Sequence, residues 1–191
     1  MGTVPIVINV YIIWNSAVRH STVWCEEAAM ENDERIMKTV DDSRTEQVHI
    51  LFPRSLNSQG RLYGGELLAW LDEIAGIVAR RHSGMDTVTA SIDRLDFKAG
   101  ASLGDMVYIN GYLTYVGKTS MEVRIDSYVE EPKSGMRRLI NTAFFVMVAL
   151  GQDGKPAPVP GLKIRTINEQ QAWESGKRRK ELSKNRRTEG Y

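Results

Sequence analysis

One long helical segment, followed by a run of strand-like segments, limits what this chain can fold into. Residues 64–82 carry apolar side chains at helical spacing, and Gly84 follows as a residue type that commonly ends helices. Strand-like patterns occur at residues 46–51, 87–97, 106–116, 121–130 and 138–150. Because short turns join the last four, they should pair antiparallel, and their apolar face must be covered. The sequence therefore predicts an α+β fold in which a curved antiparallel sheet wraps around one long helix.

Two interruptions of these patterns are informative. The alternation of residues 87–97 slips in phase at Asp93 and Arg94, which predicts a β-bulge or bend there. Residues 53–63 are rich in Ser, Asn, Gln and Gly, and therefore predict a loop directly before the helix.

Length and composition indicate one globular domain with extensions. The chain has 191 residues, of which 42% are hydrophobic, enough for a single core. We expect the domain at residues 44–162, an N-terminal extension at 1–43 and a basic, helical tail at 163–191. The apolar start at residues 4–14 lacks a preceding Lys or Arg and a clear cleavage site, which argues against a signal peptide. The composition changes at Met30, so residues 1–29 are expected to be poorly ordered or non-native.

Charge and cysteine content exclude several classes of protein. The formal net charge is +1, so the chain as a whole does not indicate a polyanionic partner, and nucleic acid is not expected. The single cysteine, Cys25, excludes an intramolecular disulfide and favours a reducing, cytoplasmic location. The histidines at 20, 49 and 82 offer no zinc spacing, and no apolar run is long enough to span a membrane.

The basic tail admits two interpretations. Residues 177–180 (KRRK) and 184–187 carry its charge and could contact nucleic acid or an acidic surface. A solvated helix or a frayed end is the simpler expectation, because charge runs usually face water.

Asp72 is the unusual residue of the predicted helix. Asp72 lies in a helical stripe with Gly65, Ala69, Gly76 and Ala79, all of which are small. Glu66, Glu73 and Arg80 form the expected solvent face instead. A carboxylate away from that face must be hydrogen-bonded, partly wet or shifted in pKa. Asp72 therefore either ties down a loop through backbone N–H groups or belongs to a functional site.

The paired glycines at the helix start support the second interpretation. Gly64 and Gly65 present unobstructed backbone N–H groups at a positive helix end, which can hold a phosphate or a developing oxyanion. A tight turn with close packing is the structural alternative. Other catalytic motifs are missing: the chain has no P-loop or G-x-G-x-x-G sequence, and no G-x-S-x-G elbow at a predicted strand-to-helix turn. His82, in the last helical turn, is favoured there by the helix dipole alone.

Five motifs in order resemble the hotdog-fold acyl-CoA thioesterases of the cytosolic acyl-CoA hydrolase type. The motifs are P-x-x-x-N-x-x-G-x-x-Y-G-G at 53–65, WLDEIAGIVARRH at 70–82, TVTASIDRLDF at 87–97, GKTSMEV at 117–123 and GKPAPVPGL at 154–162. This resemblance implies a hotdog domain, a long helix wrapped by an antiparallel sheet. It also implies at least a homodimer, with a trimer of dimers as a further possibility.

The resemblance also implies roles for individual residues. Asp72 matches the family's acid, which acts as general base or nucleophile, and Asn57 matches an asparagine supplied by the other subunit. Gly65 matches the backbone donor to the thioester oxygen, next to Gly64. Lys118, Thr119 and Ser120 match a turn near CoA, although an ordinary hairpin turn would explain them too. Arg61 stands where relatives often have Asn or Asp, and its role toward phosphate or pantetheine stays open.

We therefore expect an acyl-CoA thioester hydrolase that needs no metal or further cofactor, because a thioester is already activated. An acyl-CoA-binding sensor or regulator without hydrolysis is the alternative, and a structural or nucleic-acid partner acting through the tail is another. A hotdog dehydratase or hydratase is disfavoured, because the helix places no histidine near Asp72. The sequence does not indicate the acyl chain length.

Overall fold

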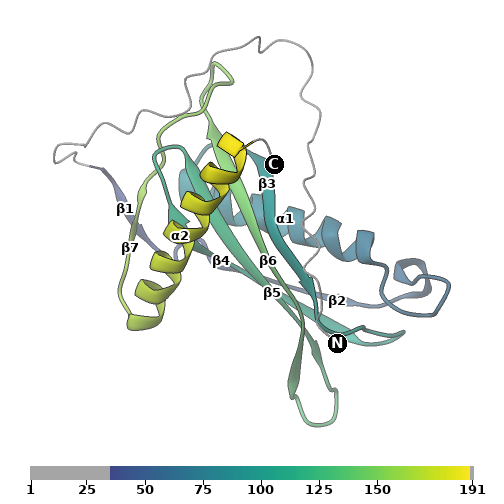
Figure 1. Ribbon diagram of the computed structural model, residues 1–191. Helices are drawn as coiled ribbons and strands as arrows, with labels where there is room; N and C mark the ends of the chain where they lie inside the picture. The colour runs from purple at the N-terminus through teal and green to yellow at the C-terminus, as the bar shows by residue number, and fades with distance from the viewer. Residues whose placement is uncertain (1–34, 190–191) are drawn as a thin grey trace.

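The computed structural model describes residues 35–189 and shows a sheet with a helix on each face (Figure 1). The antiparallel sheet has the strand order β2-β4-β5-β6-β3. Its strands are β2 (Thr45–Ile50), β3 (Asp86–Phe97), β4 (Met106–Val116), β5 (Ser120–Glu130) and β6 (Arg137–Leu150). Helix α1 (Gly64–Ser83) lies behind the sheet in this view, and helix α2 (Ile167–Glu189) lies in front of it. A short 3-10 turn, η1 (Pro53–Ser55), precedes α1.

The predicted fold class is confirmed, and the helix and strands lie within one or two residues of their expected bounds. Gly84 ends α1 in the left-handed conformation, with φ of 71°, and its N–H donates to the carbonyl of Arg80. The pairing of β3 with β6 shifts register between Ile92 and Arg94, where the phase slip predicted a bulge. A second shift, between Thr89 and Ser91, was not predicted.

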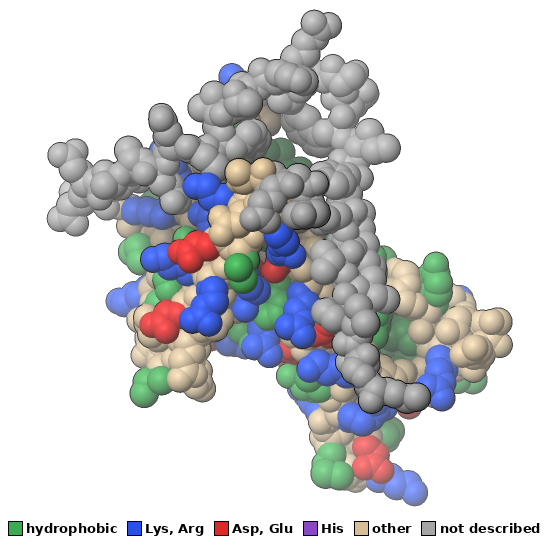
Figure 2. All heavy atoms as spheres, viewed as in Figure 1, with side chains coloured by type: hydrophobic (Ala, Val, Ile, Leu, Met, Phe, Trp, Pro, Cys, Tyr) green, Lys and Arg blue, Asp and Glu red, His purple; other side chains and the backbone are tan. Residues whose placement is uncertain are grey.

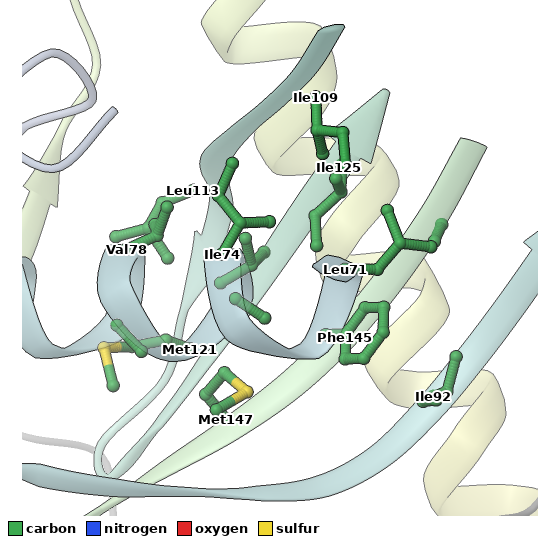
Figure 3. Close-up of a cluster of buried hydrophobic side chains, with 14 of the residues drawn as sticks. Leu71, Ile74, Val78, Ile92, Ile109, Leu113, Met121, Ile125, Phe145 and Met147 are labelled. Atoms are coloured by element: carbon green, nitrogen blue, oxygen red, sulfur yellow. The ribbon is translucent and has the colours of Figure 1, made fainter. Parts of the chain in front are cut away.

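The core fills the space between α1 and the inner face of the sheet. Leu71, Ile74 and Val78 project from α1 and are fully buried against strand residues such as Ile125 and Phe145 (Figure 3). The helix comes close to β4 at Gly111, where an added Cβ would lie 3.2 Å from Val78 Cγ2. The apolar stripe recognised in the sequence is therefore the face that holds α1 in the curve of the sheet.

A short parallel pair, which the sequence did not predict, joins the beginning and the end of the domain. β1 (Met37–Thr39) pairs with β7 (Gly161–Lys163). Next to it, Lys38 Nζ donates to the carbonyls of Arg81 and His82, so a cation satisfies the last carbonyls of α1. The rest of the predicted N-terminal extension, including residues 1–29, lies outside the described residues.

The basic tail forms α2 and packs on the outer face of the sheet. Gly176 allows close contact, because an added Cβ there would lie 2.6 Å from Tyr115 Cβ. Arg179 makes two hydrogen bonds, of 2.9 and 2.8 Å, to the buried carboxylate of Glu122 in β5, and Arg186 pairs with Asp93 in β3. Figure 2 shows many Lys and Arg side chains on this face. Two of the positive charges of α2 are paired with carboxylates of the sheet, those of Glu122 and Asp93.

No helix within residues 35–189 is both long and apolar enough to cross a membrane.

Candidate active site

The structure places Asp72 half-buried on α1 and gives it one side-chain partner. Thr89 Oγ1 donates to Asp72 Oδ1 at 2.6 Å. No backbone N–H in the described chain donates to this carboxylate, so Asp72 does not tie down a loop in the way that the structural alternative required. A hydroxyl bonded to one oxygen fixes the orientation of the carboxylate and leaves Oδ2 available for another group.

Thr89 is a candidate site residue that the sequence did not reveal. It lies in β3, and the same hydroxyl oxygen is 3.5 Å from Met147 Sδ in β6. In the sequence it is one of three hydroxyl residues that alternate with apolar ones. Nothing in that alternation shows which of the three would face a helix residue 17 positions away.

The stripe of small residues beside Asp72 is partly open. Gly65 and Ala69 are exposed, Gly76 is half-buried and only Ala79 is fully buried. The neighbouring strand β3 is also an edge of the sheet, with no strand beyond it in the described chain. An open edge and an open stripe of small residues therefore adjoin each other, next to Asp72.

The start of α1 offers backbone donors. Tyr63 is the N-cap residue and makes no side-chain cap bond, and the first intrahelical bond from this end is Leu67 N–H to the Tyr63 carbonyl. The N–H groups of Gly64 and Gly65 have no acceptor among the described residues. The ring of Tyr63 lies over Gly65 so closely that an added Cβ would be 2.5 Å from Cε1. A side chain at residue 65 would therefore require the exposed Tyr63 ring to move.

Asn57 organises the loop that leads to the helix. Its Oδ1 accepts from the backbone N–H groups of Gln59, at 2.9 Å, and Arg61, at 3.1 Å, and the residue is exposed. The loop is held against the helix start because Tyr63 N–H donates to the Ser55 carbonyl. No hydrogen bond joins Asn57 to Asp72 within residues 35–189.

The predicted site residues therefore form two clusters in a single chain. Asn57 and Gly65 belong to the helix start, here named the donor cluster, whereas Asp72 and Thr89 form the acid cluster. Seven residues separate Gly65 from Asp72, a rise of about 10 Å along the helix. No hydrogen bond joins the two clusters within residues 35–189.

The turn between β4 and β5, which carries Lys118, Thr119 and Ser120, lies near the acid cluster. The Thr119 carbonyl accepts from Ala149 N–H at 3.1 Å, and Ala149 pairs with Thr87, two residues from Thr89. Neighbouring strands are about 4.8 Å apart, so two strand spacings put the turn roughly 10 Å from β3. Lys118 is exposed, while Arg35 holds the turn from behind through the Gly117 and Val159 carbonyls.

The other residues singled out in the sequence lie elsewhere. Arg61 is exposed beside Gly100 in the loop of the donor cluster, away from the turn. His82 is fully buried at the far end of α1, and its Nε2 lies 2.9 Å from the Pro160 carbonyl. Burial lowers the pKa of His82, and nearby Lys38 and Arg35 add to this effect, although the bond to Pro160 opposes it. No group of three His, Cys, Asp or Glu side chains suited to a metal ion occurs in the described part of the chain.

Comparison with known proteins supports the resemblance seen in the motifs. The model of the thioesterase superfamily matches residues 59–136. An uncharacterized acyl-CoA thioester hydrolase of Bacillus subtilis is 37% identical over 146 residues, which cover 76% of this chain and 85% of that protein.

Solved structures agree with this result. A hexameric acyl-CoA thioesterase in the apo state is 39% identical, with a TM-score of 0.76, and the match covers 79% of this chain and 97% of that one. An acyl-CoA hydrolase from Staphylococcus aureus, solved with butyryl coenzyme A, coenzyme A and coenzyme A disulfide, is 33% identical with a TM-score of 0.77 over 80% and 93% of the two chains. Alanine variants of that hydrolase at an asparagine, an aspartate and a threonine are also among the similar structures. Together, the sequence identity, the coverage and the shared fold show that this chain belongs to the hotdog-fold acyl-CoA thioester hydrolases of the thioesterase superfamily.

Proposed function

We propose that this protein hydrolyses acyl-CoA thioesters to a free acid and CoA, with Asp72 activating the attacking water. The observation that carries the proposal is the 2.6 Å hydrogen bond from Thr89 to Asp72, which orients a half-buried carboxylate beside an open stripe of small residues. Membership of the acyl-CoA thioester hydrolases supports the substrate class.

In the proposed reaction, Asp72 Oδ2 accepts a proton from water while the water oxygen attacks the thioester carbonyl carbon. The carbonyl oxygen becomes an oxyanion and accepts a hydrogen bond from Gly65 N–H, an interaction worth about 3 kcal/mol to the transition state. Collapse of the tetrahedral intermediate breaks the carbon–sulfur bond. CoA leaves as a thiolate, and the proton held by Asp72 returns to the departing sulfur or to solvent.

We propose that the two clusters meet at the interface between two subunits. In our proposal, Asn57 and Gly65 of one subunit serve Asp72 and Thr89 of the other, because the clusters are about 10 Å apart along one helix. The open β3 edge and the small residues beside Asp72 are where a second chain could come close. The hexameric relative makes a trimer of such dimers the natural larger assembly.

The spacing of residues in a relative supports the same assignment. The asparagine, aspartate and threonine replaced by alanine in the Staphylococcus aureus hydrolase are separated by 15 and 17 residues. Asn57, Asp72 and Thr89 have the same two separations here. Thr89 thereby joins the proposed site on two independent grounds, its bond to Asp72 and this spacing.

The CoA end of the substrate is proposed to lie at the turn after β4. Lys118 offers an exposed ammonium group, and Thr119 and Ser120 offer hydroxyls, a combination suited to phosphate oxygens. The turn is roughly 10 Å from β3 at Thr87, two residues from Thr89 in the acid cluster, and the pantetheine arm of CoA is long enough to span such a gap. Arg61 and Gly64, in the donor cluster, would contact the substrate on the other side of the thioester.

The test is release of free thiol from acyl-CoA, measured with a thiol reagent. Asp72→Ala and Asn57→Ala should each lose most turnover while remaining dimeric. Two matched controls should keep activity. Glu73→Gln changes the exposed acid that follows Asp72 in the helix, and Gln59→Ala changes an exposed residue in the same loop as Asn57. Near-normal turnover in both active-site variants would refute the assignment. Binding of acyl-CoA by the parent protein without thiol release would instead support the non-catalytic sensor.

The route of water can be tested separately. If Asp72 acts as a general base, a single turnover in ¹⁸O-labelled water puts the label directly into the released acid. If Asp72 is a nucleophile and water opens the mixed anhydride at the Asp72 carbonyl carbon, the first acid released carries an unlabelled oxygen from Asp72. The proposal predicts label in the acid of the first turnover.

A further inference from the structure

Two aromatic rings flank the backbone of Gly64 and Gly65. The Tyr63 ring covers Gly65, and an added Cβ at Gly64 would lie 3.6 Å from Phe97 Cζ. The two rings come from different elements, since Tyr63 precedes α1 and Phe97 ends β3. An aromatic ring therefore lies beside each of the two glycines at the helix start.

Both rings are unusually open to solvent in the single chain. The exposed fraction is 58% for Tyr63 and 53% for Phe97. Exposed apolar surface beside a proposed site can be covered by a ligand or a partner. Their contact with Gly64 and Gly65 puts this surface where the proposed oxyanion would be held.

The position of the CoA turn decides which part of the substrate would meet the rings. Lys118 lies on the side of the acid cluster, roughly 10 Å from β3 by strand spacing. Phe97 lies at the opposite end of β3 from Thr87, next to the helix start. In the proposed two-subunit site, CoA would extend from Asp72 toward the turn of the same subunit. The acyl chain would then lie beside Tyr63 and Phe97 of the subunit that supplies Gly65.

We propose that Tyr63 and Phe97 contact the first methylenes of the acyl chain and thereby set the preference for acyl length. This inference rests on the proposed hydrolysis of acyl-CoA and adds a residue-level origin of specificity. Neither ring takes part in proton transfer. Their contribution should therefore depend on how many methylenes the acyl chain offers, with each buried methylene changing kcat/KM by about fourfold.

The experiment compares kcat/KM for acetyl-CoA and hexanoyl-CoA in the parent protein, Tyr63→Ala, Phe97→Ala and the double variant. We expect the hexanoyl-to-acetyl ratio to fall by about tenfold or more in the double variant, with a smaller change in the rate on acetyl-CoA. Tyr63→Phe keeps the ring and should keep the ratio. Phe52→Ala is the matched control, because Phe52 is 54% exposed but does not contact the glycines, and it should also keep the ratio.

Three outcomes would overturn the proposal. One is an unchanged ratio in the double variant, and another is an equal loss on both substrates, which would indicate a structural role. The third is dissociation of the variant dimers in size-exclusion chromatography with the ratio unchanged, which would show that the rings are covered by the partner subunit. Absence of thiol release by the parent protein would instead refute the hydrolysis on which the inference rests.

Discussion

Thr89 Oγ1 and Asp72 Oδ1, on a strand and a helix that face each other, are joined by a 2.6 Å hydrogen bond. This bond uses one oxygen of the carboxylate and leaves the other without a hydrogen bond in the described chain. The hydroxyl therefore positions the acid without competing for the oxygen that would take a proton from water.

Replacing Thr89 by valine should lower kcat far more than it changes KM. A hydrogen bond to a charged group is worth about 1.5–3 kcal/mol, so a loss on the order of tenfold or more is expected. Thr89→Ser should recover most of the rate, because it restores a hydroxyl at the same position. Thr87→Val, two residues away and also half-buried, is the control. Equal effects at both threonines would show that the Thr89 bond has no role in turnover.

Gly76 tests whether the stripe of small residues is an interface. Apart from its chain neighbours and the backbone of its own helix, no described atom lies within 4 Å of an added Cβ at Gly76. Alanine in a helix interior is favoured over glycine by about 1 kcal/mol. Gly76→Ala should therefore stabilise an isolated chain but weaken a dimer in which another backbone contacts this stripe. Sedimentation equilibrium of Gly76→Ala, with Glu73→Ala as the exposed-face control, measures the difference. A more stable protein with an unchanged dimer dissociation constant would place the interface elsewhere.

The comparison of sequence and structure shows which features depend on local pattern. The bounds of α1, the end at Gly84 and the bulge near Asp93 follow from periodicity and glycine geometry within a few residues, so the sequence predicts them. The pairing of β1 with β7 joins three-residue segments more than 120 positions apart. Such short strands have no periodicity to recognise.

Only part of the candidate site could be predicted from the sequence. Asp72 is conspicuous because an acid interrupts a stripe of small residues. Thr89 is not, because its role arises only when β3 packs beside α1. The packing of α2 on the sheet could not be predicted for a related reason. In the sequence, Arg179 is one cation in a run of charges, and its partner Glu122 is one polar residue of an alternating strand.

The pair of Arg179 and Glu122 should contribute to stability. The Glu122 side chain is 7% exposed and the Arg179 side chain 22%, and the guanidinium also lies 3.9 Å from the centre of the Phe144 ring. Arg179→Ala leaves a buried carboxylate whose remaining side-chain partner is Thr114, at a cost of about 3 kcal/mol in the free energy of unfolding. Adding Glu122→Gln should recover part of that loss. Arg178→Ala, exposed on the same helix, is the control for denaturant unfolding, and an equal effect there would contradict this account.

His82 should make stability depend on pH. Its pKa in the folded state is lowered, first by burial, with Lys38 and Arg35 acting in the same direction and Pro160 and Asp42 opposing. The neutral ring is therefore favoured by folding. Its contribution is complete above the unfolded pKa, about 6.5, and is lost as pH falls below it, by up to about 1.4 kcal/mol per pH unit.

Denaturant unfolding between pH 5 and 7.5 measures this dependence. His82→Gln keeps a donor toward the Pro160 carbonyl but cannot be protonated in this range, so its stability should fall less steeply with acid. His49→Gln serves as the comparison for the pH profile. Desolvation lowers the pKa of His49 too, but His49 is only half-buried, whereas His82 is fully buried. Identical pH profiles for the parent protein and His82→Gln would rule out this contribution.

Mixing two inactive variants tests the central claim, that Asn57 and Asp72 of different subunits form one thioesterase site. Asp72→Ala and Asn57→Ala are co-expressed with different tags, and thiol release from acyl-CoA is measured on the statistical mixture of dimers. In a heterodimer, one site recovers both residues and the other loses both, so the mixture should regain about a quarter of the parent activity. If the mixture shows no more activity than the two variants measured separately, both residues must serve a site within one chain, and the account is contradicted.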